Sequence, residues 1–289
     1  MLALLSSPVL LATLSAFLFG ASVLSSKRGL LHVDPQTGSM ISICTTVVIY
    51  GCLAPFLVRA EYWSSPAIWI FMANGLIHPL VSMTMSFEAT RRMGAMVSST
   101  VSSASPWFST LGALALLGER LTASNLLGTL ATVIGIMILT YDPGGTRTWA
   151  RSDLLFALLA AAVRGSNNLM GKFGLDILPV PFMAAWLSFS VSGLGSVLIY
   201  RLRTGALPRS LPRGGLRWFS LTGAGISMAI LCMYAALAGG QVVVIAPITA
   251  AYPVFTLLLS LLLRQEVLSG KIVLGTLVAV AGVVLISLK

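Results

Sequence analysis

The chain has 289 residues, of which 57% are hydrophobic and only 9% are charged. An ordinary soluble domain has about 25% charged residues, so this composition excludes a water-soluble globular protein and indicates an integral membrane protein. The formal net charge of +10 does not indicate nucleic-acid binding, because the basic residues lie in short segments between apolar stretches and form no contiguous face.

Ten apolar stretches follow one another along the chain, each close to the roughly 20 residues that cross a bilayer as a helix. In chain order they cover residues 8–26, 39–58, 66–87, 93–118, 123–141, 152–172, 181–200, 215–237, 240–263 and 268–288. The sequence therefore predicts an all-α integral membrane fold with ten transmembrane helices.

The two halves of the chain repeat each other. Residues 86–142 align without a gap on residues 233–289, and residues 13–30 align on residues 158–175. Each half has five predicted spans, and an odd number makes the two copies enter the membrane in opposite senses. We therefore predict two five-helix inverted-topology repeats, residues 1–146 and residues 147–289. Such duplicated halves are typical of transporters that bind their substrate between the repeats.

Each half has, in the same order, a proline in its fourth span, a glutamate at the end of that span and two glycines in its fifth span. These residues are Pro106, Glu119, Gly128 and Gly135 in the first half, and Pro253, Glu266, Gly275 and Gly282 in the second. In this pattern nearly the whole chain resembles the EamA-like branch of the drug/metabolite transporter superfamily. The resemblance implies a transporter with a central cavity and alternating access, usually an exporter of metabolites, in an inner (plasma) membrane.

Arg164, in the middle of the sixth span, is the main candidate for substrate binding. Ionisable residues are costly inside a membrane and usually face the bundle interior or water. Asn167 and Asn168 share its helix face by their i+3 and i+4 spacing. A guanidinium in a cavity of low dielectric constant suits pairing with a carboxylate or a phosphate. The alternative is a structural arginine that pairs with a helix-end carbonyl or an acidic residue.

Hydroxyl groups follow one face of the fourth span at Ser98, Ser102 and Ser105, and the ninth span places Tyr252 at the position equivalent to Ser105. We predict that these residues contact the substrate. The alternative is helix packing, because small residues also let membrane helices approach closely.

In the third span, Asn74 and His78 share a face and are further candidates for substrate binding. His78 could carry a proton, because the reference pKa of histidine, about 6.5, lies near physiological pH. The alternative is a neutral histidine that only donates and accepts hydrogen bonds.

The prolines inside the fourth and ninth spans, Pro106, Pro247 and Pro253, are expected to kink their helices and act as gates, because proline removes a backbone hydrogen bond. The repeated pair Glu119 and Glu266 is expected to fix helix ends or pair with loop cations. The repeated glycines are expected to let the fifth and tenth spans pack closely.

No Asp or Glu lies in the middle of a predicted span, which disfavours a proton-coupled antiporter of cationic drugs. We predict a secondary transporter, an exporter of a small carboxylate-bearing or zwitterionic metabolite such as an amino acid. The alternatives are an exporter of cationic or lipophilic drugs, a membrane-embedded enzyme and a non-transporting membrane scaffold. An enzyme is not expected, because no catalytic constellation is visible, and neither a cofactor nor a metal motif is present.

The expected partners are the lipid bilayer and a small-molecule substrate, and ten spans can form a complete carrier as a monomer or a homodimer. Lys and Arg lie mostly in the loops on one side of the predicted spans. By the positive-inside rule that side is cytoplasmic, which leaves both termini outside. Many members of the family that the chain resembles have cytoplasmic termini instead.

Overall fold

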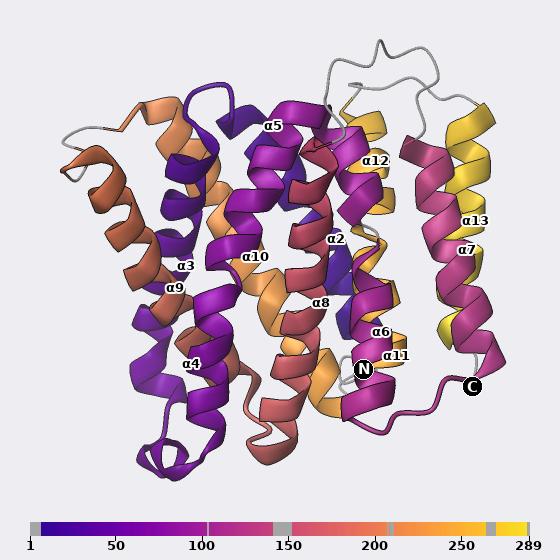
Figure 1. The fold of residues 1–289 in the computed structure, drawn as a ribbon, viewed down its shortest axis with the longest axis horizontal. Helices are drawn as coiled ribbons and strands as arrows, with labels where there is room; N and C mark the ends of the chain where they lie inside the picture. The colour runs from indigo at the N-terminus through magenta and orange to yellow at the C-terminus, as the bar shows by residue number, and fades with distance from the viewer. Residues whose placement is uncertain are drawn as a thin grey trace.

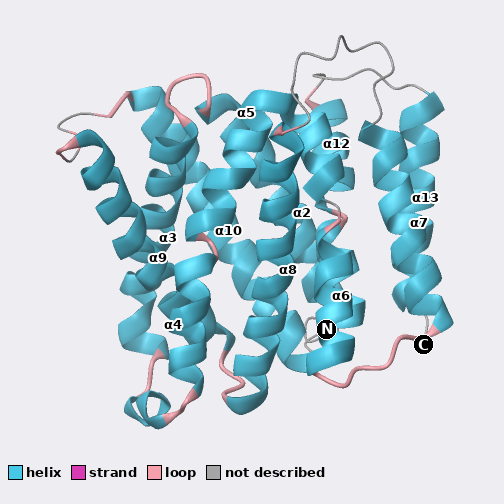
Figure 2. Ribbon diagram, in the orientation of Figure 1, coloured by secondary structure: helices cyan, strands magenta, loops and turns pink. Residues whose placement is uncertain are grey.

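The computed structural model describes residues 7–102, 104–140, 152–206, 208, 211–263 and 270–287. These residues form helices joined by short loops and turns, with no strand among them (Figure 2). The predicted all-helical fold is therefore confirmed for the described part of the chain. α2 begins and α13 ends on the same side of the bundle (Figure 1).

The helices of the first half are α2 (Pro8–Gly29), α3 (Pro35–Leu57), the 3-10 helix η1 (Ala60–Ser64), α4 (Ala67–Ile77), α5 (Leu80–Ser102), α6 (Ser105–Leu116) and α7 (Ala123–Thr140). The helices of the second half are α8 (Asp153–Ile177), α9 (Pro181–Thr204), α10 (Arg213–Gly239), α11 (Val242–Ala250), α12 (Tyr252–Leu262) and α13 (Gly270–Ser287).

The third and fourth predicted spans are divided differently in the structure. Residues 88–92 were expected to separate them, but these residues are helical and belong to α5. The segment has no glycine or proline, and the carboxylate of Glu88 pairs with Arg91 and Arg92 one turn later, which favours helix. The helix is interrupted instead at Pro79, between α4 and α5, because proline cannot donate a backbone hydrogen bond to the preceding turn.

The ninth predicted span, residues 240–263, consists of two helices. α11 ends at Ala250 and α12 begins at Tyr252, one residue before Pro253. The residue before a proline disfavours the α conformation, and the proline ring clashes with the preceding turn. The interruption of the helix between α11 and α12 therefore follows from the local sequence.

The two halves pack against each other reciprocally. α2 lies against α10 and α12, and its counterpart α8 lies against α5 and α6. At the closest points, a Cβ atom at Gly20 would lie 2.9 Å from the Cβ of Phe255, and one at Gly165 would lie 2.7 Å from the Cβ of Phe108. Gly20 and Gly165 are equivalent in the alignment, as are Phe255 and Phe108. The same contact therefore occurs twice, as a two-repeat architecture requires.

α7 and α13 lie side by side at one end of the bundle (Figure 1). A Cβ atom at Gly128 would lie 2.7 Å from the carbonyl oxygen of Gly282, and one at Gly135 would lie 2.3 Å from the backbone nitrogen of Ala279. Only residues without a larger side chain allow this approach. The predicted close packing of the fifth and tenth spans is confirmed at these positions.

Within the described residues, six helical stretches are long and apolar enough to cross a membrane. They are Pro8–Gly29, Pro35–Leu57, Ala67–Ala89, Pro181–Thr204, Arg213–Gly239 and Val242–Leu262. Large apolar side chains on the outside, such as Phe56 and Leu194, are suited to contact lipid. These features are those of a multi-pass membrane protein.

Basic side chains join helix ends on one side of the bundle. The guanidinium carbon of Arg28 lies 4.9 Å from the ring centroid of Trp218, and this contact joins the end of α2 to the start of α10. The guanidinium carbon of Arg217, also in α10, lies 5.7 Å from the same ring centroid. Arg203 at the end of α9 donates a hydrogen bond to Gln36 at the start of α3. We refer below to this side, where α2 ends and α10 begins, as the basic end.

Candidate functional site

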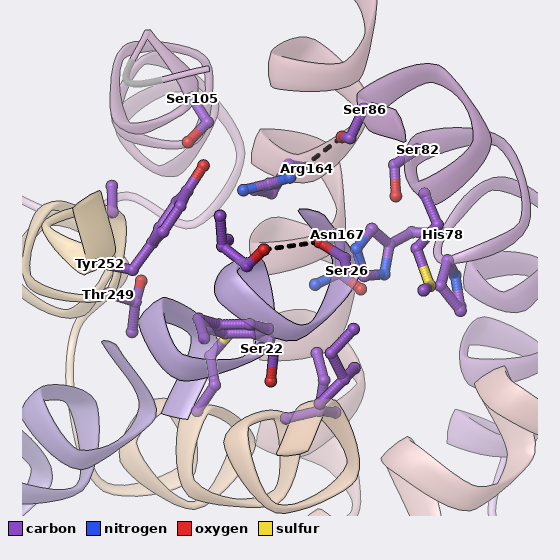
Figure 3. Close-up of a pocket in the computed structure, with 18 of the residues that line it drawn as sticks. Ser22, Ser26, His78, Ser82, Ser86, Ser105, Arg164, Asn167, Thr249 and Tyr252 are labelled. Atoms are coloured by element: carbon purple, nitrogen blue, oxygen red, sulfur yellow. Dashed lines mark hydrogen bonds between the residues drawn. The ribbon is translucent and has the colours of Figure 1, made fainter. Parts of the chain in front are cut away.

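A cavity of about 140 Å³ lies inside the bundle and is lined by residues of both halves. The lining side chains come from α2, α5, α6, α8, α9, α10, α11 and α12, with His78 and Pro79 contributed by the break between α4 and α5 (Figure 3). Pockets for drug-sized ligands usually have volumes of about 300–1,000 Å³. In this conformation the cavity therefore fits a small solute.

Equivalent faces of α2 and α8 line opposite parts of the cavity with different chemistry. α8 contributes Arg164 and Asn167, whose counterparts on α2 in the repeat alignment are Phe19 and Ser22. The duplication therefore placed the same helix face at the cavity twice, but only α8 carries a charge at this level. This difference makes the cavity chemically asymmetric.

Arg164 lies in the cavity between two polar walls. Its Nη2 atom donates a hydrogen bond of 3.2 Å to the hydroxyl of Ser86 on α5, and its guanidinium carbon lies 5.5 Å from the ring centroid of Tyr252 on α12. Figure 3 shows Arg164 between these two residues. The hydroxyl and the aromatic ring orient the guanidinium without neutralising it.

None of the acidic side chains that the structure describes forms an ion pair with Arg164. Each has another interaction: Asp34 caps α3, Glu61 pairs with Arg59, Glu88 pairs with Arg91 and Arg92, Glu119 binds the start of α11, Asp153 pairs with Arg92, and Asp176 pairs with Lys172. Among the described residues that line the cavity there is no Asp or Glu, whereas Lys27 and Arg164 both line it. The described charged groups that line the cavity are therefore positive, which favours an anion over a cation.

Lys27 is exposed, lies near the end of α2 and also lines the cavity. The cavity therefore extends from the middle of α8, where Arg164 lies, toward the basic end. The arrangement places one cation deep in the cavity and a second near its entrance.

A buried hydrogen-bond network joins α4, α8 and α10. The Nδ2 atom of Asn74 donates to Oδ1 of Asn167 at 2.8 Å and to the hydroxyl of Tyr234 at 3.0 Å, and that hydroxyl donates to the same Oδ1 atom at 2.9 Å. Each of the three side chains is 1% exposed. Asn167 also lines the cavity, whereas Asn74 and Tyr234 do not. The network therefore supports the cavity wall from behind.

The remaining candidates for substrate binding occupy several environments. His78, Ser105, Asn168 and Tyr252 line the cavity together with Arg164. Ser98 and Ser102 lie outside the residues whose side chains are described. The roles of these residues in binding stay predictions.

The proline and glutamate candidates lie at helix ends or inside helices. Pro106 is in the first turn of α6, Pro253 is in the first turn of α12, and Pro247 is inside α11. The carboxylate of Glu119 accepts hydrogen bonds from the backbone at the start of α11. Glu266 lies outside the described residues. Gating by the prolines stays a prediction.

Sequence reasoning did not single out several polar residues at the site. Tyr234 belongs to the buried network, and Ser22, Ser26, Lys27 and Ser86 line the cavity. The alignment of Ser22 with Asn167 was a signal that could have found the α2 wall. Tyr234 had a weaker signal, namely that a buried tyrosine hydroxyl usually requires a hydrogen-bond partner.

The helical bundle and its central cavity are those of a membrane transporter, and comparison with known proteins specifies the family. The model of the EamA-like transporter family matches residues 6–141 and again residues 151–288. The chain belongs to the EamA-like transporter family, within the drug/metabolite transporter superfamily, and is thus grouped with transporters rather than enzymes. No curated protein matches the chain significantly.

Solved structures share the fold. One crystal structure superimposes with a TM-score of 0.78 at 18% sequence identity, and the match covers 97% of this chain and 96% of that chain. At this identity the likeness shows the fold alone.

Proposed function

We propose that the chain is a secondary transporter that moves a small carboxylate-bearing or zwitterionic metabolite, such as an amino acid, by alternating access. The observation that carries this proposal is Arg164, a cation in the central cavity that pairs with none of the described acidic residues. A guanidinium in a water-poor cavity binds carboxylate strongly and in a defined geometry. The substrate would supply the negative charge that the protein does not.

The charges in the cavity argue against a cationic substrate. Arg164 and Lys27 would repel a cation, and the described lining residues include no carboxylate to offset that repulsion. A neutral lipophilic substrate would leave the guanidinium without a negatively charged partner. An anionic group on the substrate is therefore the better match.

Alternating access is supported by the difference between the end of the cavity at Lys27 and its wall at Asn167. One end reaches the exposed Lys27, whereas Asn167 in the wall is held by the buried hydrogen bonds to Asn74 and Tyr234. We propose that the structure corresponds to a state open toward the basic end. Opening of the cavity toward the opposite side of the bundle would then disturb the hydrogen bonds among Asn74, Asn167 and Tyr234. The reciprocal packing of the halves supports ten spans in two inverted repeats.

We further propose that the basic end is cytoplasmic, that both termini lie outside, and that the protein exports its substrate across the inner (plasma) membrane. The positive-inside rule supports this orientation. Single cysteines would test it after Cys44, Cys52 and Cys232 are replaced. A membrane-impermeant thiol reagent added to intact cells should label Glu61→Cys and not Leu31→Cys; the opposite pattern would reverse the orientation.

The transport proposal can be tested by counterflow in liposomes that contain the purified protein. Amino acids, organic acids and lipophilic cations would be compared in the native chain and in Arg164→Gln. Saturable exchange of carboxylates should collapse in Arg164→Gln, because the neutral amide removes the cation. Arg59→Gln is the matched control, since Arg59 is exposed and pairs with Glu61 away from the cavity.

Two other outcomes would point to different functions. Saturable exchange of lipophilic cations that is unaffected by Arg164→Gln would indicate a cationic-drug exporter. An absence of saturable exchange for every compound, with folded protein in the liposomes, would contradict transport of these compound classes.

A further inference from the structure

Asn167 and Asn168 are neighbours in the sequence, but their amide groups have different environments. The Oδ1 atom of Asn167 accepts two hydrogen bonds, from Asn74 and Tyr234. The Oδ1 atom of Asn168 is buried and has no hydrogen-bond partner among the described residues. Asn168 is only 5% exposed and lines the cavity. Asn167 therefore has a structural role, whereas the carbonyl of Asn168 is left without a hydrogen-bond partner among the described residues.

Nearly all buried polar groups in folded proteins have a hydrogen-bond partner, because an unpaired carbonyl away from water is unfavourable. The lack of a partner for a carbonyl oxygen in a cavity wall is explained if a ligand supplies the missing hydrogen-bond donor. Asn168 follows Arg164 by four residues, so the two side chains start from the same helix face, about 6 Å apart.

The hydroxyl groups of the cavity wall add further acceptors. Ser22, Ser26, Thr222 and Thr249 all line the cavity, and each donates its hydroxyl proton to a backbone carbonyl of its own helix. With the proton used in this way, a hydroxyl oxygen can only accept from a ligand. The cavity therefore combines the cationic donors Arg164 and Lys27 with several acceptors.

We infer that the cavity has a second subsite, at Asn168, for a hydrogen-bond donor of the substrate. This inference rests on the proposed function: Arg164 binds the anionic group of the substrate, and the Oδ1 atom of Asn168 accepts a hydrogen bond from an ammonium or hydroxyl group on the same molecule. Asn168 is thus a specificity-determining residue. It selects anions that carry a donor over anions that carry only a carbonyl or alkyl group at that position.

Two matched ligand series can test the subsite. The three-carbon series is alanine, lactate, pyruvate and propionate, and the larger series is phenylalanine, phenyllactate, phenylpyruvate and phenylpropionate. Within each series the carboxylate is constant and only the group at the second carbon changes. Binding is measured as ligand-induced thermal stabilisation of the purified chain, and transport as competition in counterflow.

In the native chain, the amino and hydroxy compounds of at least one series should bind about ten-fold more tightly than the keto and unsubstituted compounds. Asn168→Leu should reduce this ratio to about one while retaining affinity for the unsubstituted acid. Asn168→Asp keeps the shape and adds negative charge, so it should favour the ammonium compound over the hydroxy compound. Asn125→Leu in α7, away from the cavity, is the matched control and should keep the native ratio.

The outcomes separate this inference from the proposed function. If no carboxylate binds the native chain, the proposed function fails. If carboxylates bind but the keto and unsubstituted acids bind as tightly as the amino and hydroxy acids, the transport proposal stands and the donor subsite is wrong. A native preference for donors that persists in a folded Asn168→Leu and is unaltered in Asn168→Asp would also overturn the role of Asn168.

Discussion

The carboxylate of Glu119 lies 2.8 Å from the backbone nitrogen of Val242 and accepts a hydrogen bond from it. Its second oxygen accepts from the next backbone nitrogen, that of Val243, at 2.9 Å. Glu119 follows α6 of the first half, and Val242 begins α11 of the second half. The first N–H groups of a helix have no partner within it, and negative charge there is favourable. One side chain thus caps a helix of the other half.

Replacement of Glu119 by alanine should destabilise the protein by about 1–3 kcal/mol, because two buried donors lose a charged acceptor. Glu119→Gln should cost less, because its amide oxygen still accepts one bond. The measurement is the midpoint of thermal unfolding in detergent. Glu61→Ala, which removes an exposed carboxylate, is the control, and equal midpoints for Glu119→Ala and Glu61→Ala would contradict the capping role.

The buried network makes a second prediction about stability. Tyr234→Phe removes the hydroxyl that joins Asn74 to Asn167, and the loss of such a buried hydrogen bond costs about 1–3 kcal/mol. A lower unfolding midpoint is therefore expected, together with altered transport, since Asn167 lines the cavity. Tyr200→Phe on α9 removes a hydroxyl outside the network, and the prediction is wrong if the two variants behave alike.

Asp34 gives a prediction about pH. Partial burial raises the pKa of its carboxyl, but hydrogen bonds from Thr37 and from the backbone of Gln36 outweigh this, so the pKa lies below its ordinary value of 3.8. The stabilisation from this helix cap is therefore present above the unfolded-state pKa and is lost as the pH falls through the lower folded-state pKa.

Asp34→Ala should accordingly lower the stability by about 0.5–2 kcal/mol at neutral pH, as is typical for loss of an N-cap. The difference from the native chain should shrink as the pH is lowered below about 4. Unfolding midpoints of both proteins between pH 7 and pH 3 measure this. A difference that stays constant over the whole range would show that ionisation of Asp34 does not contribute.

The close contact between α2 and α12 predicts that Gly20 tolerates no larger side chain. A Cβ atom there would lie 2.9 Å from the backbone nitrogen of Thr256, so the helix backbones would have to move apart. Gly20→Val should cost about 1–3 kcal/mol and reduce transport, because α12 also carries Tyr252 in the cavity wall. Gly51→Val is the control, since no atom lies within 4 Å of a Cβ there.

The local patterns of the chain were sufficient for much of the fold. Apolar stretches of membrane length predicted the helices, and the duplicated proline, glutamate and glycine positions predicted two repeats of the EamA-like family, which the family comparison confirms. The boundary predicted at residues 88–92 was wrong. The charged residues there suggested a loop, whereas the ion pairs of Glu88 with Arg91 and Arg92, one turn later, favour a helix.

By itself the sequence determined that the protein lies in a membrane, that it is built from a repeated helical half, and that Arg164, Asn167 and Asn168 share a helix face. Each of these follows from spacing along the chain. Only the tertiary structure decided which groups meet: Asn74 reaches Asn167 across 93 positions, and Glu119 reaches Val242 across 123. Such partners are set by how helices pack, and for that reason the paired carbonyl of Asn167 and the unpaired carbonyl of Asn168 could not be distinguished from the sequence.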